Sequence, residues 1–431
     1  MKPLAPDFDI VVRAKDPMKE YMYSPAIIVL PSGRYVVSYD IGDDDGMVCV
    51  SDDKGKTWKT TAERKFWHAS IFADGDILYL LAVSNKFDNN LVVLRSDDSG
   101  DSWTEEIPIT ENELYHHCAT DVWYKDGYVY VPFEKRVIHE GEVVKSGWKP
   151  NVCAPVVLRG KLGTDLTKRE NWLFSEVARF RDVIKESEIE GFGIPFFPSI
   201  EDKKDGEEGT ASPVKYRDEY DFENDKPASK FFFHATGWLE TNIVQITDPK
   251  HYWYDPTGKT FHLFMRANTH TTGYCCLMKA VERVRDGKEV IDVECQLSPS
   301  GKRMIFLPMP GGQNKFFVKY DEKTKLYWLV SVQATDSMTR VEHLGRDRYN
   351  IPNDERNRLA LHFSKNMVDW IFVGLVDKTD FQDQARHYAS MEIDGDDLLV
   401  VSRTGDEDAK DAHDTNIISL HRIKNFRDLV Y

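Results

Sequence analysis

Two copies of one eight-residue motif constrain the fold of this chain more than any other feature. Ser51–Trp58 reads SDDKGKTW and Ser96–Trp103 reads SDDSGDSW, so both fit Ser-x-Asp-x-Gly-x-Thr/Ser-Trp. Trp58 and Trp103 lie 45 residues apart, and a spacing of roughly 40–45 residues is typical of four-stranded propeller blades. The Asp is suited to close a tight turn by accepting backbone amide hydrogen bonds, and the Gly allows a positive φ. The motif therefore predicts a hairpin turn that recurs from blade to blade, without a chemical role of its own.

Short apolar runs separated by turn residues continue this rhythm along the chain. Segments such as YSPAIIVLPSGRYVVSYDI, WHASIF, ILYLLAVS, YVYVPFEKR and NKFFVKYDEKTKLYWLVSVQ have the pattern expected of strands. Residues 165–172 and 364–370 look like weakened copies of the turn motif. The sequence therefore predicts an all-β propeller of about seven blades, with residues 1–431 forming a single domain.

Residues 175–230 interrupt the strand pattern. The segment EVARFRDVIKESEIEG has the composition of a short helix, and the stretch that follows it is charged and rich in turn residues. Such a composition cannot bury enough apolar surface to form its own core. We therefore expect an exposed insertion within the propeller rather than a second domain.

The charge balance limits the partners of the chain. It contains 72 acidic against 56 basic residues, which gives a formal net charge of −16. Because this charge repels phosphate backbones and anionic headgroups, we expect neither nucleic acid nor a membrane as a partner. An anionic small substrate stays open, since it needs only a local basic pocket. The sequence does not indicate the oligomeric state.

The cysteines predict buried free thiols, because no CxxC pair is present and six cysteines do not make a disulfide scaffold in a chain of 431 residues. His262, His270, Cys275 and Cys276 fall close together, but their spacing fits no common zinc finger and adjacent strand residues face opposite sides. We therefore expect no required cofactor and leave open a structural calcium or zinc ion.

The first residues, MKPLAPDFDI, match neither a signal peptide nor a membrane span. We therefore expect a cytoplasmic protein, or a secreted or periplasmic one if a leader was removed.

The two turn motifs resemble the Asp-boxes of the sialidase superfamily. A sialidase of this kind also carries an Arg-Ile-Pro triplet at its first strand, whose arginine is one of three that bind the sialate carboxylate. The equivalent stretch here reads YSPA over residues 23–26, with Ser24 in place of the arginine. This departure argues against sialidase activity.

A longer set of segments resembles a branch of sialidase-like seven-bladed propellers found among polysaccharide-degrading enzymes. The likeness covers most of the chain and rests on FWHASIF, YHHCATDVWYKDGYVYVPFE, GWLETNIV, FLPMPGGQNKFFVKYD, LALHFSKNMVDW and DGDDLLVVSRTG with the tail behind it. That branch includes lyases that cut rhamnose–glucuronate or ulvan-type linkages and enzymes first described as α-L-rhamnosidases. Val131 is a departure, because relatives often have arginine there. The resemblance implies an enzyme that cleaves a glycosidic bond at a uronate or rhamnosyl-uronate unit of an anionic polysaccharide or oligosaccharide, by β-elimination.

Elimination at a uronate needs a base for the ring proton beside the carboxylate, a group that neutralises the carboxylate, and an acid for the leaving oxygen. His68 begins a predicted strand and matches the place of a catalytic histidine in the resembling enzymes. His116 and His117 face opposite sides of a strand, so one of them faces the axis, and we favour His117. Arg266 and Arg403 end strands and are the candidates to pair with the carboxylate.

Further polar residues near strand ends are candidates to hold the sugar: Glu240, Asn242, Lys315, Arg386, His387, His413, Tyr130 and Tyr274. A glycoside hydrolase would instead need two facing carboxylates, for which we would first inspect Asp40, Glu134, Glu240 and Asp414. Such a hydrolase, of α-L-rhamnosidase-like or sialidase-like type, remains one alternative, and a non-catalytic carbohydrate-binding propeller remains another.

Overall fold

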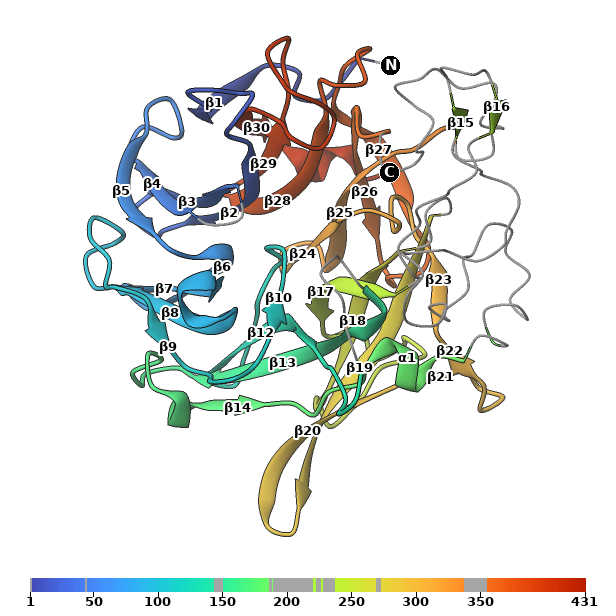
Figure 1. Cartoon of the computed structure of the whole chain (residues 1–431). Helices are drawn as coiled ribbons and strands as arrows, with labels where there is room; N and C mark the ends of the chain where they lie inside the picture. The colour runs from blue at the N-terminus through green and yellow to red at the C-terminus, as the bar shows by residue number, and fades with distance from the viewer. Residues whose placement is uncertain are drawn as a thin grey trace.

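The chain folds into sheets of four or five strands that follow one another around a ring, as the computed structural model shows (Figure 1). The structure describes residues 2–42, 45–142, 150–185, 188, 220–221, 226–227, 237–268, 273–336 and 355–431. Six such sheets occur in these ranges, and we number them blades 1 to 6 in chain order. The expected all-β propeller is confirmed.

The first three blades take up the N-terminal part of the chain. Blade 1 contains β2 (Met22–Val29), β3 (Tyr35–Ile41), β4 (Asp45–Ser51) and β5 (Lys59–Arg64). Blade 2 contains β6 (Trp67–Asp74), β7 (Ile77–Ser84), β8 (Asn90–Ser96) and β9 (Ile107–Pro108). Blade 3 contains β10 (Tyr115–His116), β11 (Trp123–Lys125), β12 (Tyr128–Arg136), β13 (Cys153–Lys161) and β14 (Trp172–Phe174).

The other three blades follow the region of the expected insertion. Blade 4 contains β17 (Trp238–Val244), β18 (Thr260–Ala267), β19 (Tyr274–Arg285), β20 (Lys288–Glu294) and β23 (Phe306–Pro308). Blade 5 contains β24 (Phe317–Asp321), β25 (Leu326–Val332), β26 (Arg358–Ser364) and β27 (Ile371–Lys378). Blade 6 contains β28 (Arg386–Asp394), β29 (Asp397–Thr404), β30 (Ile417–Ile423) and β1 (Phe8–Arg13).

The ring is closed by strands from both ends of the chain. β1 pairs antiparallel with β30 as the outermost strand of blade 6, so blade 6 combines N-terminal and C-terminal segments. The inner strand β2 contacts both β6 and β28, its neighbours around the axis. Because the strands alternate their side chains, each blade packs against both of its neighbours. The described residues accordingly form six hydrophobic cores, one at each junction between blades.

The expected number of about seven blades is not confirmed. The apolar runs after Trp238 suggest more rounds than they form, because β23, which lies in the run MIFLP, adds to β19 of blade 4 instead of beginning a new sheet. Short pairs also occur outside the blades, namely β21 (Gln296–Leu297) with β22 (Arg303–Met304) and β15 (Tyr220–Asp221) with β16 (Lys226–Pro227). Within the expected insertion, α1 spans only Phe180–Val183, and most of residues 186–236 lie outside the described part.

The two sequence motifs form the predicted turns, between β4 and β5 and between β8 and β9. Asp53 accepts hydrogen bonds from the backbone amides of Lys56 and Thr57 at 3.0 and 2.9 Å, and Trp58 Nε1 donates to the Gly55 carbonyl at 2.9 Å. The second motif repeats this arrangement around its own Asp and Trp. Both motifs therefore act as structural devices at the periphery of the blades.

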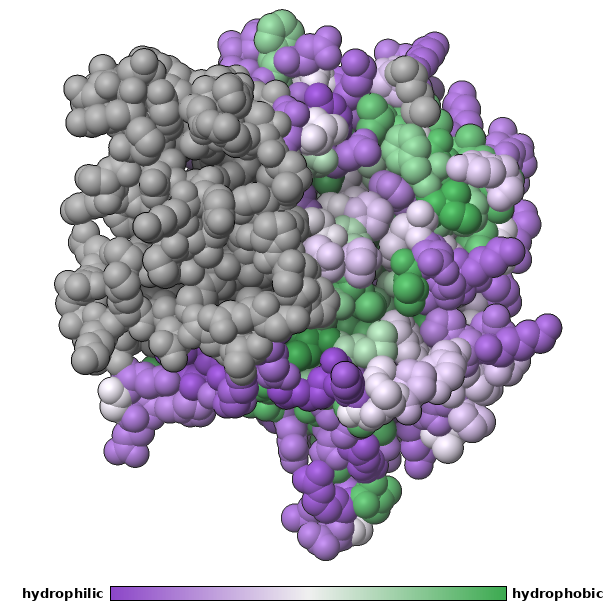
Figure 2. Space-filling view, turned by 90° about the vertical axis from the view of Figure 1, so that its right-hand side faces the viewer, coloured by the Kyte–Doolittle hydropathy of each residue, from purple (hydrophilic) through white to green (hydrophobic). Residues whose placement is uncertain are grey.

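On the coloured part of the face that Figure 2 shows, hydrophilic side chains surround several hydrophobic patches. Large exposed hydrophobic side chains in the described ranges, such as Tyr252 and Phe381, are few. No helix within the described residues has the length and apolarity that a membrane span requires.

Substitution of Gly55 tests whether the turn motif of blade 1 packs closely against the neighbouring blade. The φ of Gly55 is +89°, and a Cβ added there would overlap Leu420 Cδ2 in blade 6. Gly75 has a φ of +61°, and a Cβ added there would meet nothing within 4 Å. We expect Gly75→Ala to cost about 1–2 kcal/mol of unfolding free energy through φ alone, and Gly55→Ala to cost about 1–3 kcal/mol more through the clash. Urea denaturation followed by tryptophan fluorescence measures both, and equal losses would contradict the interlocking role.

Candidate active site

Four of the six inner strands that the structure describes share a kink near their first residues. In β2, β6, β17 and β28 the pairing register shifts at the same place, and the residue in the kink has a positive φ: Ser24 (35°), His68 (53°), Glu240 (58°) and Tyr388 (49°). Such bulges re-aim side chains and recur beside active sites. The segments YSPA, WHAS, LETN and HYAS align on this kink, and HCAT (117–120) and NKFF (314–317) occupy the same place in blades 3 and 5.

Hydrogen bonds at these segments connect every blade to the next one. We call this set of contacts the axial belt. Its members, in order around the ring, are Ser24 Oγ with His68 Nδ1 (2.7 Å), Ser70 Oγ with His117 Nε2 (3.0 Å), Thr120 Oγ1 with the Thr241 carbonyl (2.7 Å), Asn242 Nδ2 with the Phe316 carbonyl (3.2 Å), Lys315 Nζ with the Ala389 carbonyl, and Ser390 Oγ with the Pro25 carbonyl (2.6 Å). The belt fixes the position of each inner strand relative to both neighbours.

Aromatic, imidazole and basic side chains gather where the inner strands begin. We call this group the axial cluster, and its members are Tyr23, Trp67, His68, His116, Glu240, Arg266, Arg356, Tyr388, Arg403 and His413. They come from blades 1 to 6 and from the loop between β29 and β30. The bulges direct several of these side chains to one place, which packing of flat strands would not do.

His68 is the centre of the imidazole half of the cluster. Its ring lies 4.4 Å from that of Trp67, 4.9 Å from that of Tyr23 and 5.5 Å from that of His116, measured between ring centres. Nδ1 faces Ser24 Oγ and lies 3.2 Å from Asp40 Oδ2. Burial lowers the pKa of His68 well below its usual value, and it lowers that of His116 to about 4. Both imidazoles are therefore neutral near pH 7.

Tyr388 and three arginines form the other half. Arg266 Nη1 donates to the Tyr388 hydroxyl at 3.0 Å and lies 3.3 Å from Glu240 Oε1. The Arg403 guanidinium lies 4.0 Å from the centre of the Tyr23 ring and 4.8 Å from that of Tyr388. Burial and the nearby Glu240 raise the pKa of Tyr388, although the arginines oppose this effect. The phenol is therefore protonated at neutral pH.

Arg403 carries a charge that is not matched by a carboxylate in the described part of the chain. Its side chain is fully buried, and Nη2 donates to the His413 carbonyl. Nε and Nη1 are buried and have no hydrogen-bond partner among the described residues. A buried guanidinium in this state gains strongly from an incoming anion.

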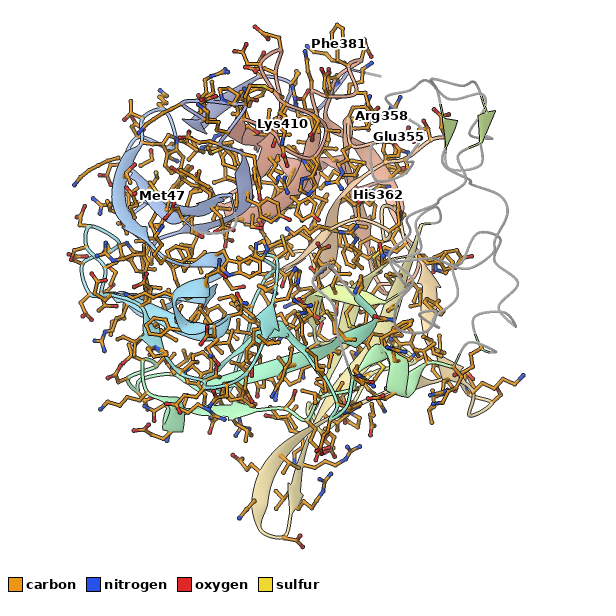
Figure 3. The ribbon with its side chains drawn as sticks, in the orientation of Figure 1. Met47, Glu355, Arg358, His362, Phe381 and Lys410 are labelled. Atoms are coloured by element: carbon orange, nitrogen blue, oxygen red, sulfur yellow. The ribbon has the colours of Figure 1, made fainter. Side chains whose placement is uncertain are left out.

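Arg356 reaches the cluster from the segment before β26. Its guanidinium lies 5.6 Å from the centre of the Tyr388 ring, and Nη1 lies 3.0 Å from His387 Nδ1. The neighbouring Glu355 and Arg358, labelled in Figure 3, form an ion pair at 2.8 Å. Because Glu355 is fully buried, this pair anchors the backbone on both sides of Arg356.

Several sequence-predicted residues lie in or beside the axial cluster. His68, Glu240, Arg266 and Arg403 are members, and His413 forms its half-exposed rim, 5.9 Å from Tyr23 between ring centres. Lys315 and Asn242 belong to the axial belt, and burial lowers the pKa of Lys315 to about 8. His387 lies behind Tyr388, bonded to Arg356.

His117 belongs to the axial belt through Ser70, is fully buried and stacks on Phe133 at 4.1 Å between ring centres, whereas the ring of His116 contacts the cluster. Three other predicted residues lie elsewhere. The Arg386 guanidinium is bound to Asp377 and to three backbone carbonyls. Tyr130 donates to Glu282 between blades 3 and 4. Tyr274 begins β19 and packs against the hydrophobic core between the same two blades.

The weak metal candidates are not brought together. Cys275 and Cys276 face different hydrophobic cores, as strand alternation predicts, and His262 Nε2 lies 3.1 Å from Gln296 Oε1. His270 lies outside the described residues. The ranges that the structure describes contain no group of three or more potential metal ligands. All six cysteines are free thiols, and five of them are buried, as expected.

The carboxylates that a two-acid hydrolase would use are committed to other partners. Asp40 binds the backbone amide of His68 at 2.9 Å, and Glu134 binds Thr241. Asp414 pairs with His413 and Lys410 at the surface. Glu240 is the carboxylate that lies in the cluster itself, beside Arg266.

Four members of the cluster, Tyr23, Trp67, Arg356 and Tyr388, were not predicted from the sequence. Of the paired histidines His117 was favoured, whereas His116 is the one whose ring contacts the cluster. The two tyrosines lie in YSPA and HYAS, the segments that align on the kink. Aligning the starts of the inner strands would therefore have found them. Arg356 has no such signal, because a tertiary contact alone brings it to Tyr388.

Comparisons with known proteins support the fold. No protein-family model matches the chain, and no curated protein matches it. Among solved structures, a protein of unknown function from Dyadobacter fermentans is 11% identical with a TM-score of 0.52, over 97% of this chain and 98% of that one. Trypanosoma rangeli sialidase is 12% identical with a TM-score of 0.51, over 97% of this chain and 60% of that one. An α-L-arabinofuranosidase of Fusarium graminearum is 9% identical with a TM-score of 0.49, over 97% and 98%.

His262 predicts part of the response of stability to pH. Burial lowers its pKa to about 4, so below pH 6.5 the unfolded chain takes up a proton that the folded chain does not. Stability is therefore lost as pH falls from about 6.5 towards 4. We expect His262→Gln to lose about 2 kcal/mol less unfolding free energy between pH 7 and pH 5 than the wild type. Urea titrations at both pH values measure this difference. If the wild type and His262→Gln lost the same unfolding free energy between pH 7 and pH 5, the prediction would be wrong.

Proposed function

We propose that this protein is a carbohydrate-active enzyme that cleaves a glycosidic bond of an anionic sugar, with the axial cluster as its active site. The observation that carries the proposal is the placement of Arg266, Arg356 and Arg403 around Tyr388 at the axis of an acidic chain. Local positive charge in a mostly buried site favours a carboxylated ligand over a neutral one. The structural likeness to a sialidase supports a saccharide as that ligand.

The arrangement favours hydrolysis with Tyr388 as the nucleophile. Sialidases are an exception to the two-carboxylate rule because they use a tyrosine, and Glu240 is the single carboxylate in this cluster. Since the Tyr388 phenol is protonated at rest, a base must remove its proton. Glu240 is suited to this role, and the Arg266 N–H that points at the phenolic oxygen stabilises the negative charge that develops there. As the phenolate bonds to the anomeric carbon and the glycosidic bond breaks, the leaving oxygen takes the proton of the neighbouring Tyr23 phenol. Water then displaces Tyr388 from the sugar, the water proton returns to Tyr23 through His68, and Glu240 returns its proton to Tyr388.

A uronate lyase of the rhamnose–glucuronate or ulvan type is the second candidate. The neutral imidazole of His68 lies beside the protonated phenol of Tyr23, whose pKa burial raises well above its usual value. These two groups supply the base and the acid of an elimination, and Arg403 supplies the neutraliser. Tyr388 has no chemical step in that reaction, so the two candidates respond differently to its substitution.

The test of the reaction type uses a panel of sialylated and uronate-containing glycans. We expect new reducing ends without the ultraviolet absorbance of an unsaturated uronate, and a fall in kcat of at least about 100-fold in Tyr388→Phe. Tyr124→Phe is the matched control, because Tyr124 is half exposed and its hydroxyl bonds only the Ala73 backbone among the described residues. Unsaturated product together with an active Tyr388→Phe enzyme would establish the lyase instead. No cleavage of any glycan would overturn both candidates.

The preference for a negative charge is tested with a carboxyl-reduced form of the cleaved glycan. We expect the wild type to lose roughly 10–100-fold in kcat/KM on the reduced glycan, since a charge-assisted hydrogen bond contributes about 1.5–3 kcal/mol. Arg403→Met should lower kcat/KM on the native glycan and remove most of this discrimination. If the ratio of kcat/KM between the native and the carboxyl-reduced glycan were the same in Arg403→Met and the wild type, Arg403 would not bind the carboxylate. A urea midpoint at or above that of the wild type would exclude misfolding as the cause.

A further inference from the structure

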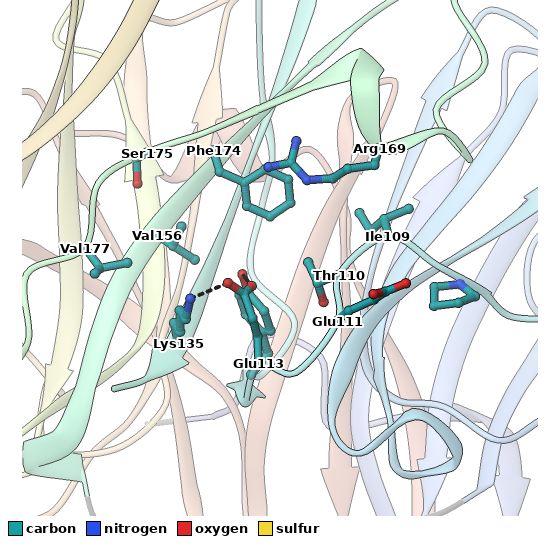
Figure 4. Close-up of a pocket in the computed structure, with 12 residues that line it drawn as sticks. Ile109, Thr110, Glu111, Glu113, Lys135, Val156, Arg169, Phe174, Ser175 and Val177 are labelled. Atoms are coloured by element: carbon teal, nitrogen blue, oxygen red, sulfur yellow. Dashed lines mark hydrogen bonds and ion pairs between the residues drawn. The ribbon is translucent and has the colours of Figure 1, made fainter. Parts of the chain in front are cut away.

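A cavity lies between blades 2 and 3, outside the axial cluster (Figure 4). Its volume is about 450 Å³, which lies in the range of roughly 300–1,000 Å³ for small-ligand sites. Its walls come from β9 and the segment after it, from β10, β12 and β13, and from the short 3-10 turn Arg169–Asn171 with β14 and the segment that follows. No member of the axial cluster lines it, so it is a separate site.

Arg169 stands at the wall of this cavity without an acidic partner in the described part of the chain. Nη1 donates to the Trp172 carbonyl at 2.8 Å, and the guanidinium carbon lies 3.8 Å from the centre of the Phe174 ring. Figure 4 shows the guanidinium extending beside that ring. These two contacts hold the group in one orientation and leave its Nε and Nη2 edge without a described partner. A fixed guanidinium edge binds a carboxylate through two parallel hydrogen bonds.

Glu113, a carboxylate of the cavity wall that acts on the pKa of Arg169, is bonded to other groups. Glu113 accepts hydrogen bonds from Lys135 Nζ and from the Tyr115 hydroxyl, each at 2.5 Å. Burial lowers the pKa of Arg169, and Tyr115 and Glu113 oppose this only in part. A negatively charged ligand would compensate the arginine, and the exposed Glu111 at the rim would accept hydrogen bonds from hydroxyl groups.

The cavity and the axial cluster lie on two sides of one short strand. Tyr115 lines the cavity, whereas His116, the next residue of β10, lies 5.5 Å from His68 between ring centres. Successive residues of a strand face opposite sides. A linear glycan that occupied both sites would pass over β10.

We propose that this cavity is a subsite for a carboxylated sugar unit of a polymeric substrate, bound through Arg169. The proposal rests on the proposed function and specifies its substrate as a glycan with repeated acidic units rather than a single terminal one. It assigns a binding role to the cavity and leaves bond cleavage to the axial cluster. The cavity would thus set the affinity and the direction of the polymer, while cleavage takes place at the axis.

The test measures binding rather than turnover. The probes are a hexasaccharide of linked glucuronate units and glucuronate itself, titrated calorimetrically into Tyr388→Phe protein so that the probe stays intact. We expect Arg169→Ala in this background to weaken binding of the hexasaccharide about 10–100-fold. Arg169→Lys should restore only part of the affinity, because an ammonium group lacks the two parallel N–H donors of a guanidinium. Lys168→Ala is the matched control, since it removes the adjacent exposed cation, which does not line the cavity.

The outcomes separate this proposal from the proposed function. Hexasaccharide affinity that stays within twofold in Arg169→Ala overturns the subsite, whatever happens at the axis. A hexasaccharide that does not bind the parent protein also overturns it, while release of reducing ends from other glycans would leave the proposed function standing. A loss of hexasaccharide affinity that occurs in Arg169→Ala and is absent in Lys168→Ala establishes the subsite.

Discussion

The kinked start of the inner strands is the constraint on which the rest of the structure depends. A positive φ at a residue other than Gly costs roughly 1–2 kcal/mol, and Ser24, His68, Glu240 and Tyr388 all have one. Such a strained backbone conformation persists only where the surrounding contacts hold it in place. The axial belt supplies those contacts, because each kinked segment is hydrogen-bonded to the next blade. Strain at the axis is thus compatible with a site whose side chains have defined positions.

The position of the cluster also depends on closure of the ring. Its members come from every blade, so their distances are set by six junctions rather than by one sheet. The pairing of β1 with β30 holds the first and last segments of the chain together. The Asp-box turns act at the opposite, outer end of the blades, where Gly55 lies against Leu420 of the neighbouring blade. The turns therefore contribute to the site only indirectly, through the angle between blades.

The sequence predicts the architecture better than it predicts the site. The motif around Asp53 and its copy indicate a propeller, because a turn that needs Asp, Gly and Trp at fixed places has few other uses. The blade count cannot be read in this way, since a strand such as β23 adds to an existing sheet without a turn signal. His68, Arg266 and Arg403 were found because strand starts and ends meet at the axis.

The remaining site residues depend on tertiary structure. Whether His116 or His117 faces the axis depends on the register of a two-residue strand, which no local pattern fixes. Tyr388 needs the bulge to reach the cluster, and Arg356 arrives from a segment outside the inner strands.

A crystal structure of the Tyr388→Phe protein with a bound acidic oligosaccharide tests the central claim most directly. The account predicts that a sugar carboxylate lies within hydrogen-bonding distance of an axial guanidinium, with its glycosidic bond beside the site of the removed Tyr388 hydroxyl. A sugar bound only elsewhere on the propeller, with the axial cluster unchanged, would contradict it.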